Sequence, residues 1–165
     1  MKNIKDLVLY ASVAAIYIVL TMLLGGLSFG PIQFRIAEAL VLLCFFNKKY
    51  FYPLTLACLI SNFMSPFGIY DVIFGTTATI ISLLMIMRTK NIVIASLFPV
   101  IFNGIIVSIE ISLLSGIFDW SVLLFNFFTI AVGELVCVTI LGVLLFSILR
   151  KNTEFMKLIS DDKTS

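Results

Sequence analysis

The long apolar runs in this sequence constrain its fold more than any other feature. The segment 122–149 carries a single charged residue, Glu134, and the segment 92–117 carries only Glu110. A membrane-spanning helix needs about 20 apolar residues, so each of these runs is long enough to cross a bilayer. The whole chain is 61% hydrophobic and 12% charged, whereas soluble domains average about 45–50% and about 25%. A fold of this length cannot hide so much apolar surface from water, so we expect lipid to surround it.

The expected fold class is an all-α integral membrane protein, a bundle of about six transmembrane helices. Backbone polar groups in lipid must be satisfied within the protein, and the apolar runs do not alternate as barrel strands do. The expected spans are 7–24, a short helix at 37–46 that extends back through Phe34, and then 51–63, 72–87, 92–117 and 122–149. We therefore expect one membrane domain, 1–150, followed by a polar cytoplasmic tail, 151–165.

The positions of the basic residues predict the topology. Alternate connections, 25–33, 62–70 and 116–121, contain no Lys or Arg, while the remaining connections and both ends carry Lys2, Lys5, Lys48, Lys49, Arg88, Lys90, Arg150 and Lys151. Cytoplasmic loops of membrane proteins carry the excess of Lys and Arg. The pattern therefore predicts that both termini are cytoplasmic.

Several common chemistries have no sequence support. The chain contains no His, which removes Ser-His nucleophile pairs and His metal sites. It also has no Gly-rich nucleotide loop and no CxxC pair, and Cys44, Cys58 and Cys137 lie within apolar spans as packing residues. We expect no enzymatic activity, no cofactor, no metal and no nucleic-acid partner. Active transport would need energy from ions or from a partner protein.

Ionisable residues at lipid depth are costly, so each is a functional candidate. Arg35 and Glu38 are three residues apart and would share one face of a helix. One interpretation is a mutually neutralising pair that holds a short helix near the outer surface. The other is that one of the two also touches a ligand, and the sequence leaves both open.

The last two spans carry three more polar candidates. Asn103 and Glu110 are two helical turns apart on one face, where they could bind ligand or form interhelical hydrogen bonds. Glu134 follows Gly133, which permits close approach of a backbone or a ligand. No Lys or Arg lies near Glu134 in the sequence, so we favour a ligand with hydrogen-bond donors as its partner.

The outer loop after the third span carries the remaining candidates. Asn62, Phe67 and Tyr70 lie in or beside a Ser-Pro-Phe-Gly turn, and Asp71 follows it. Asp71 could bind ligand or could cap a helix that starts near Val72. The aromatic residues could form a lid over a pocket, whereas an interfacial aromatic belt would also explain Tyr70 and Trp120.

In the first span, Ala11 and Ala15 form a small-xxx-small pair. This spacing lets another helix approach closely, although Ala is common in membrane helices. The pair is therefore a candidate contact for a partner protein.

Four segments in matching order carry a family resemblance. They are 30–40 (GPIQFRIAEAL), 62–68 followed by Asp71 and 74–76, Pro99 with Asn103, and Gly133 with Glu134. Together they resemble the queuosine-precursor transporter family over nearly the whole chain. The resemblance weakens at 48–50 and in the tail 152–165.

The resemblance implies a particular kind of transporter. Members of that family are thought to be substrate-binding (S) components of energy-coupling factor transporters in the bacterial cell membrane. Such components are six-helix proteins that bind a vitamin-like molecule at the outer face, then dock on a transmembrane coupling subunit and two ATPase subunits. The resemblance also implies that Ala11 and Ala15 contact the coupling subunit.

The chemistry of a deazaguanine such as preQ1 fits the candidate residues. Its guanidine-like edge offers adjacent N–H donors, which a carboxylate accepts side by side, and its flat face suits aromatic stacking. Glu134 and Asn103 could bind the edge, Asp71 or Glu110 an ammonium group, and Phe67, Tyr70 or Trp120 the face. The alternatives are an S component for another vitamin or base, a small intramembrane enzyme using Asp71, Glu110 and Glu134, and a structural membrane protein.

Overall fold

The computed structural model describes residues 2–30, 32–116 and 118–160, and within these ranges every regular element is a helix. Three parts of the sequence predictions lie outside the described residues. They are residue 31 of the 30–40 motif, residue 117 at the end of the fifth expected span, and residues 161–165 of the tail.

The helices follow one another through short connections. In chain order they are α1 (Lys2–Leu23), α2 (Gly25–Ser28), η1 (Ile36–Leu42), α3 (Leu43–Phe46), η2 (Lys48–Tyr50), α4 (Phe51–Phe63), α5 (Ile69–Ile86), α6 (Ile92–Ser115), α7 (Trp120–Glu134), η3 (Leu135–Gly142), α8 (Val143–Leu149) and α9 (Thr153–Ile159). The elements η1 and η2 are 3-10 helices, and η3 is a π-helical stretch that joins α7 to α8.

The fold class predicted from the sequence is confirmed. Within the described ranges, four helices are long and apolar enough to cross a membrane, at Ile4–Leu23, Ile69–Ile86, Ile92–Ser115 and Trp120–Leu149. A shorter apolar stretch, Ile36–Phe46, is the second expected span, and α4 is the third. The total of six membrane crossings remains a prediction.

Local sequence signals explain several helix ends. The side-chain oxygen of Asn91 accepts hydrogen bonds from the backbone of α6, at 2.9 Å from the nitrogen of Val93. Asp119 does the same for α7, at 2.6 Å from the nitrogen of Ser121. Helix α6 ends at Ser115 and is followed by Gly116, whose φ of +67° is the left-handed conformation that glycine adopts without strain.

Two helix starts differ from the sequence predictions. The second span begins at Ile36 rather than at Phe34, because residues 32–35 run as a non-helical segment across α7. A side chain at Gly133 would overlap the carbonyl oxygen of Ile32, so glycine is what permits this crossing. Helix α5 begins at Ile69, so Asp71 lies in its first turn and makes no N-cap hydrogen bond.

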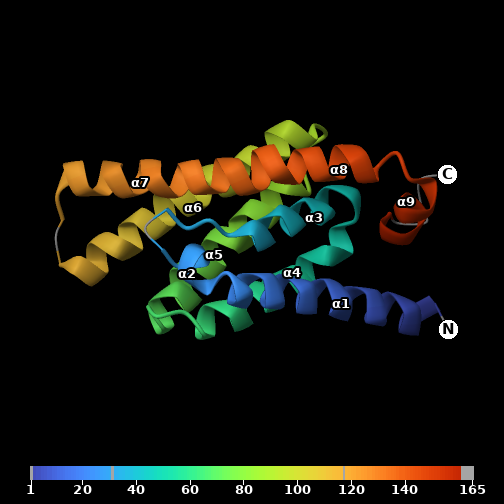
Figure 1. Cartoon of the computed structure of the whole chain (residues 1–165), viewed down its shortest axis with the longest axis horizontal. Coiled ribbons are helices and arrows are strands. Elements are labelled where there is room, and N and C mark those ends of the chain that lie inside the picture. The colour runs from blue at the N-terminus through green and yellow to red at the C-terminus, as the bar shows by residue number, and fades with distance from the viewer. Residues whose placement is uncertain (1, 31, 117, 161–165) are drawn as a thin grey trace.

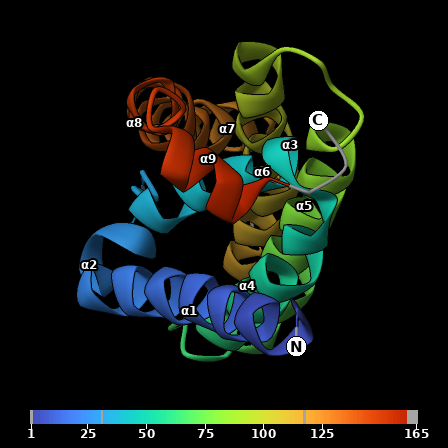
Figure 2. The ribbon, with the colours of Figure 1, turned by 90° about the vertical axis from the view of Figure 1, so that its right-hand side faces the viewer.

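The helices form an elongated bundle in which α1 begins and α8 ends at the same end (Figure 1). Helix α9 lies across that end, close to α3 and to the end of α8 (Figure 2). The buried Ile159 of α9 packs into the same apolar core as Leu54 and Phe146. This arrangement agrees with two termini on one side of the membrane, and the cytoplasmic identity of that side stays a prediction.

Helix α1 lies at the edge of the bundle, where it packs against α4 and η1 (Figure 2). In its most apolar stretch of 18 residues, only 17% of the residues are buried. The corresponding share is 44% in α5 and in α6. Large apolar side chains such as Leu7, Ile73 and Phe125 are exposed on the outer faces of the helices. Exposed apolar surface on this scale fits a lipid environment.

Candidate substrate-binding site

The polar residues singled out at lipid depth are all buried inside the bundle. They are at most 3% exposed and come from the segment before η1, from η1 and from α4, α5, α6 and α7: Arg35, Glu38, Asn62, Asp71, Asn103, Glu110 and Glu134. Burial of so many polar groups is unfavourable unless they are paired with one another or with a ligand. We call this set the polar cluster.

Arg35 links the members of the polar cluster. Its Nη1 atom lies 3.9 Å from Oε1 of Glu38, as the spacing of the two residues suggested. The guanidinium also lies within electrostatic range of Asp71, Glu110 and Glu134. Among the described residues, Arg35 is the one buried cation, and it faces four buried carboxylates.

The pair formed by Asn103 and Glu134 joins α6 to α7. The amide Nδ2 of Asn103 donates a hydrogen bond of 2.7 Å to Oε1 of Glu134. Among the described residues, neither Oδ1 of Asn103 nor Oε2 of Glu134 has a hydrogen-bond partner. Asn103 and Glu134 are therefore hydrogen-bonded to each other, and each keeps one oxygen atom inside the bundle without a partner.

Asp71 and Glu110 bring α5 and α6 together at the outer-loop side of the polar cluster. Ser65 of the loop donates its hydroxyl hydrogen bond to Oδ2 of Asp71, and the backbone nitrogen of Phe67 donates to that hydroxyl at 3.1 Å. The Glu110 carboxylate lies beside that of Asp71. Apart from each other, Oδ1 of Asp71 and both oxygens of Glu110 have no hydrogen-bond partner in the described part of the chain.

The structure adds residues that the sequence analysis did not single out. Tyr17 of α1 is fully buried and donates a hydrogen bond to Oε1 of Glu38. Phe29 lies against Arg35, whose Cζ is 5.3 Å from the ring centroid. Thr76 accepts a hydrogen bond of 3.1 Å from Nδ2 of Asn62. A tyrosine hydroxyl within the apolar first span was the one signal in the sequence that pointed to Tyr17.

The three aromatic residues suggested as stacking partners are exposed to different degrees. Trp120 is 79% exposed, whereas Tyr70 is 43% and Phe67 37% exposed. Phe29 is a further aromatic residue beside Arg35 of the polar cluster. The proposed contact of Trp120, Tyr70 and Phe67 with ligand remains a prediction.

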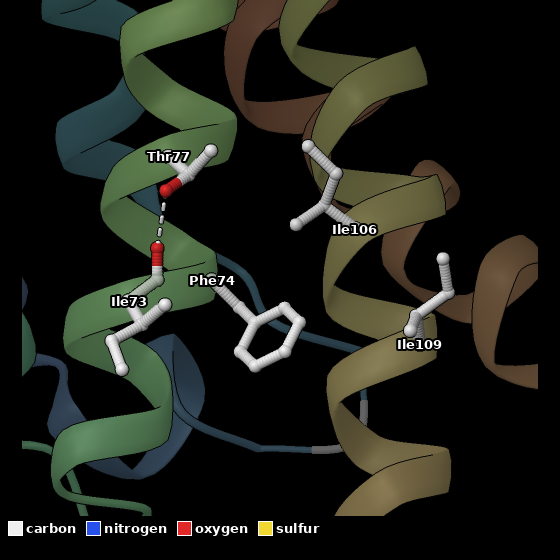
Figure 3. A pocket seen from close by; sticks show the side chains of 5 residues that line it. All are labelled: Ile73, Phe74, Thr77, Ile106 and Ile109. Carbon is white, nitrogen blue, oxygen red and sulfur yellow. Dashed lines mark hydrogen bonds between the residues drawn. The ribbon is translucent and has the colours of Figure 1, made fainter.

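A separate groove lies between α5 and α6 and has a volume of about 290 Å³. Figure 3 shows Ile73, Phe74 and Thr77 on one side of it, facing Ile106 and Ile109. The one hydroxyl there is already bonded, since Thr77 donates to the carbonyl oxygen of Ile73 at 2.5 Å. The groove has no charged side chain in its lining. Unlike the polar cluster, it therefore offers no charged partner to a ligand.

Two further findings bear on the sequence predictions. Ala11 and Ala15 are both exposed, on the face of α1 that points away from the bundle. In the described ranges, no group of His, Cys, Asp and Glu side chains is arranged to hold a metal ion.

The apolar helices and the family described next indicate a multi-pass membrane protein, and this one carries a buried polar cluster. A family model described as the QueT transporter matches residues 7–151, so the chain belongs to the QueT transporter family. A family of transporters fits the expectation that the chain is not an enzyme, and the resemblance noted from the motifs is confirmed.

One curated relative also matches. It is the queuosine precursor transporter QueT of Lactococcus lactis subsp. cremoris (strain MG1363), which is 50% identical over 80 residues. The aligned part covers 47% of this chain and 47% of the relative, about half the length of each. No solved structure matches the chain.

Proposed function

We propose that this chain captures a queuosine precursor, a deazaguanine, at the outer face of the bacterial cell membrane for uptake. The observation that carries the proposal is the Asn103–Glu134 pair, with its two unpaired acceptors inside the bundle. The relative from Lactococcus lactis carries the name of a queuosine precursor transporter, which supports the same substrate class.

The unpaired atoms match the edge of a deazaguanine. The base presents adjacent N–H donors next to a carbonyl oxygen. Oε2 of Glu134 and Oδ1 of Asn103 are acceptors for the donors, and a hydrogen bond to a charged group is worth about 1.5–3 kcal/mol. Among the described residues, Nε and Nη2 of Arg35 have no acceptor, so they are donors for the carbonyl oxygen.

The position of the site suits capture from outside. The polar cluster includes Arg35 and Asp71, which lie next to the connections that carry no Lys or Arg. The positive-inside pattern supports an outer position for those connections. The end with both termini is filled by the apolar core, including Leu54 and Phe146, so the ligand would enter from the outer side.

Energy for uptake would come from partner proteins. We propose that the chain is the S component of an energy-coupling factor transporter and docks on a transmembrane coupling subunit with two ATPases. Ala11 and Ala15 support this docking role because they leave a flat strip on the exposed face of α1. The low burial of α1 leaves that face available to a partner helix.

A titration of the purified chain tests the substrate. Calorimetry in lipid nanodiscs should show heat of binding for an aminomethyl deazaguanine and none for thiamine, riboflavin or biotin. Binding of one of those vitamins instead would favour the alternative reading, an S component for another substrate. A chain that binds none of the panel would contradict a capture role.

A double substitution tests the docking surface. Ala11→Trp with Ala15→Trp should abolish uptake in cells that contain the coupling factor, because two large side chains prevent close helix approach. Binding of the base to the purified variant should persist, since both alanines point away from the polar cluster. As a matched control, Val132→Trp places the same ring on the exposed face of α7 and should leave uptake intact. Loss of binding together with uptake would refute docking as the role of this pair.

A further inference from the structure

The segment before η1 contains an unusual backbone conformation. Among the described residues, Gln33 is the one non-glycine residue with a left-handed backbone, at a φ of +50°. This conformation is unfavourable for a residue with a Cβ atom, whereas glycine adopts it freely. The turn is held by backbone hydrogen bonds from the nitrogen of Gln33 to Gly30, at 3.0 Å, and from the nitrogen of Arg35 to Gln33, at 2.8 Å. A residue that keeps a side chain at such a position is a candidate for a function of that side chain.

The side chain of Gln33 lies inside the bundle, on the side of the polar cluster. Gln33 and Arg35 are each 3% exposed, whereas Ile32 on the same segment is 42% exposed. A Cβ atom at Gly133 would lie 3.0 Å from the carbonyl oxygen of Gln33, so Gln33 lies directly against the turn of α7 that carries Glu134. Gln33 is therefore a buried polar residue next to Arg35 and Glu134.

The side-chain amide of Gln33 is available to a ligand. The structure shows no hydrogen bond between this amide and a described residue. Two amides of the polar cluster already use their nitrogen atoms, since Nδ2 of Asn62 donates to Thr76 and Nδ2 of Asn103 donates to Glu134. A buried amide without partners is unfavourable. A ligand with a donor and an acceptor on neighbouring atoms would satisfy both groups of the Gln33 amide.

The base of the proposed substrate has one polar edge left that fits an amide. The proposed function assigns its carbonyl oxygen to Arg35 and its adjacent N–H donors to Glu134 and Asn103. The remaining edge of a free deazaguanine carries an N–H donor at position 9 next to a nitrogen acceptor at position 3. A carboxamide pairs with such an edge through two parallel hydrogen bonds. In a nucleoside the sugar replaces the hydrogen at position 9, so this pairing is lost.

We propose that Gln33 binds the substrate through its side-chain amide and makes the site selective for the free base over forms substituted at position 9. The identity of the base rests on the proposed function. The assignment of Gln33 rests on its buried, unpaired amide and on a backbone that glycine would adopt more easily. The unfavourable backbone is retained because it turns this side chain toward the ligand.

Two ligands test the selectivity on the unmodified protein. The probes are 7-aminomethyl-7-deazaguanine and its 9-methyl derivative, which differ at one edge of the base. Calorimetry in lipid nanodiscs should show that the free base binds about tenfold more tightly, or better, because the methyl group removes the donor and separates the two partners. Equal affinities would overturn the contact at this edge and leave the proposed function standing. No binding of either ligand would overturn the proposed function.

Two substitutions separate the side chain from the backbone. Gln33→Ala and Gln33→Gly both remove the amide, but only glycine relieves the left-handed conformation. Both variants should bind the free base about tenfold more weakly than the wild type, and the ratio of the two dissociation constants should fall toward one. A ratio within one sample does not depend on the fraction of folded protein. The glycine variant should melt about 2–4 °C above the alanine variant.

The control is Ile32→Ala, which shortens an exposed side chain on the same segment. Both affinities and their ratio should match the wild type in this control. Wild-type affinity and ratio in Gln33→Gly would show that Gln33 only shapes the chain, and would refute its contact with the ligand. A glycine variant that melts below the alanine variant would refute the argument from the backbone.

Discussion

The substitution Glu134→Gln is the sharpest single perturbation of the site, because it keeps the size of the side chain and removes its charge. In the wild type, Oε1 of Glu134 accepts a hydrogen bond of 2.7 Å from Nδ2 of Asn103, and Oε2 is free for a ligand. A glutamine that keeps its oxygen toward Asn103 must turn its NH2 group toward the donors of the base. The opposite orientation places that NH2 group against the amide donor of Asn103.

Either orientation leaves two buried donors facing each other. The loss of a hydrogen bond to a charged group is worth about 1.5–3 kcal/mol. At about 1.4 kcal/mol per tenfold change, the dissociation constant should rise by a factor of about 10 to 150. Asn103→Ala removes an uncharged amide, so the expected weakening is smaller, by a factor of about 2 to 12.

Calorimetry with an aminomethyl deazaguanine on purified variants measures both effects. The control is Glu154→Gln, the same chemical change in the exposed ion pair with Lys157 on α9. This control should bind like the wild type. A folded Glu134→Gln protein with unchanged affinity would refute the role of Glu134 as the anchor of the base.

Three other perturbations have defined outcomes. Gly133→Ala should lower both thermal stability and affinity, because its Cβ would overlap the segment that leads into η1; a wild-type melting temperature would show that this segment can move aside. Tyr17→Phe should lower the melting temperature by a few degrees, since the carboxylate of Glu38 loses its hydroxyl donor, and an unchanged melting temperature would make that bond dispensable. Single cysteines at Lys49 and Lys90, in a background without native cysteines, should resist an impermeant thiol reagent in intact cells. Labelling there would contradict the cytoplasmic placement of these connections.

The sequence was sufficient to predict the fold class and the membership of the polar cluster. Few charged residues occur in the apolar spans. Because burying a charge is costly, Arg35, Glu110 and Glu134 could be identified as candidates from the sequence alone. The i, i+3 spacing also anticipated the contact between Arg35 and Glu38.

Contacts between segments far apart in the chain could not be predicted from the sequence. Asn103 and Glu134 were separate candidates, and only the packing of α6 against α7 brings their side chains within hydrogen-bond distance. The same holds for Tyr17, whose partner Glu38 lies on another helix. Local patterns describe one helix face at a time, so they do not reveal which faces meet.

Aromatic residues were the least predictable part of the site. A loop rich in aromatic residues suggested Phe67, Tyr70 and Trp120, which are between 37% and 79% exposed, and their contact with a ligand stays a prediction. Phe29 lies beside Arg35 because the chain turns back after α2 and crosses α7 at Gly133. Gly133 indicated in the sequence that a backbone or a ligand could approach closely, but not that the segment before η1 would cross there.

A structure of the chain with a bound aminomethyl deazaguanine is the most direct test of the central claim. The account predicts the N–H edge of the base within hydrogen-bond distance of Glu134 and Asn103. A ligand bound instead in the apolar groove between α5 and α6, or on the outer surface beside Trp120, would contradict it.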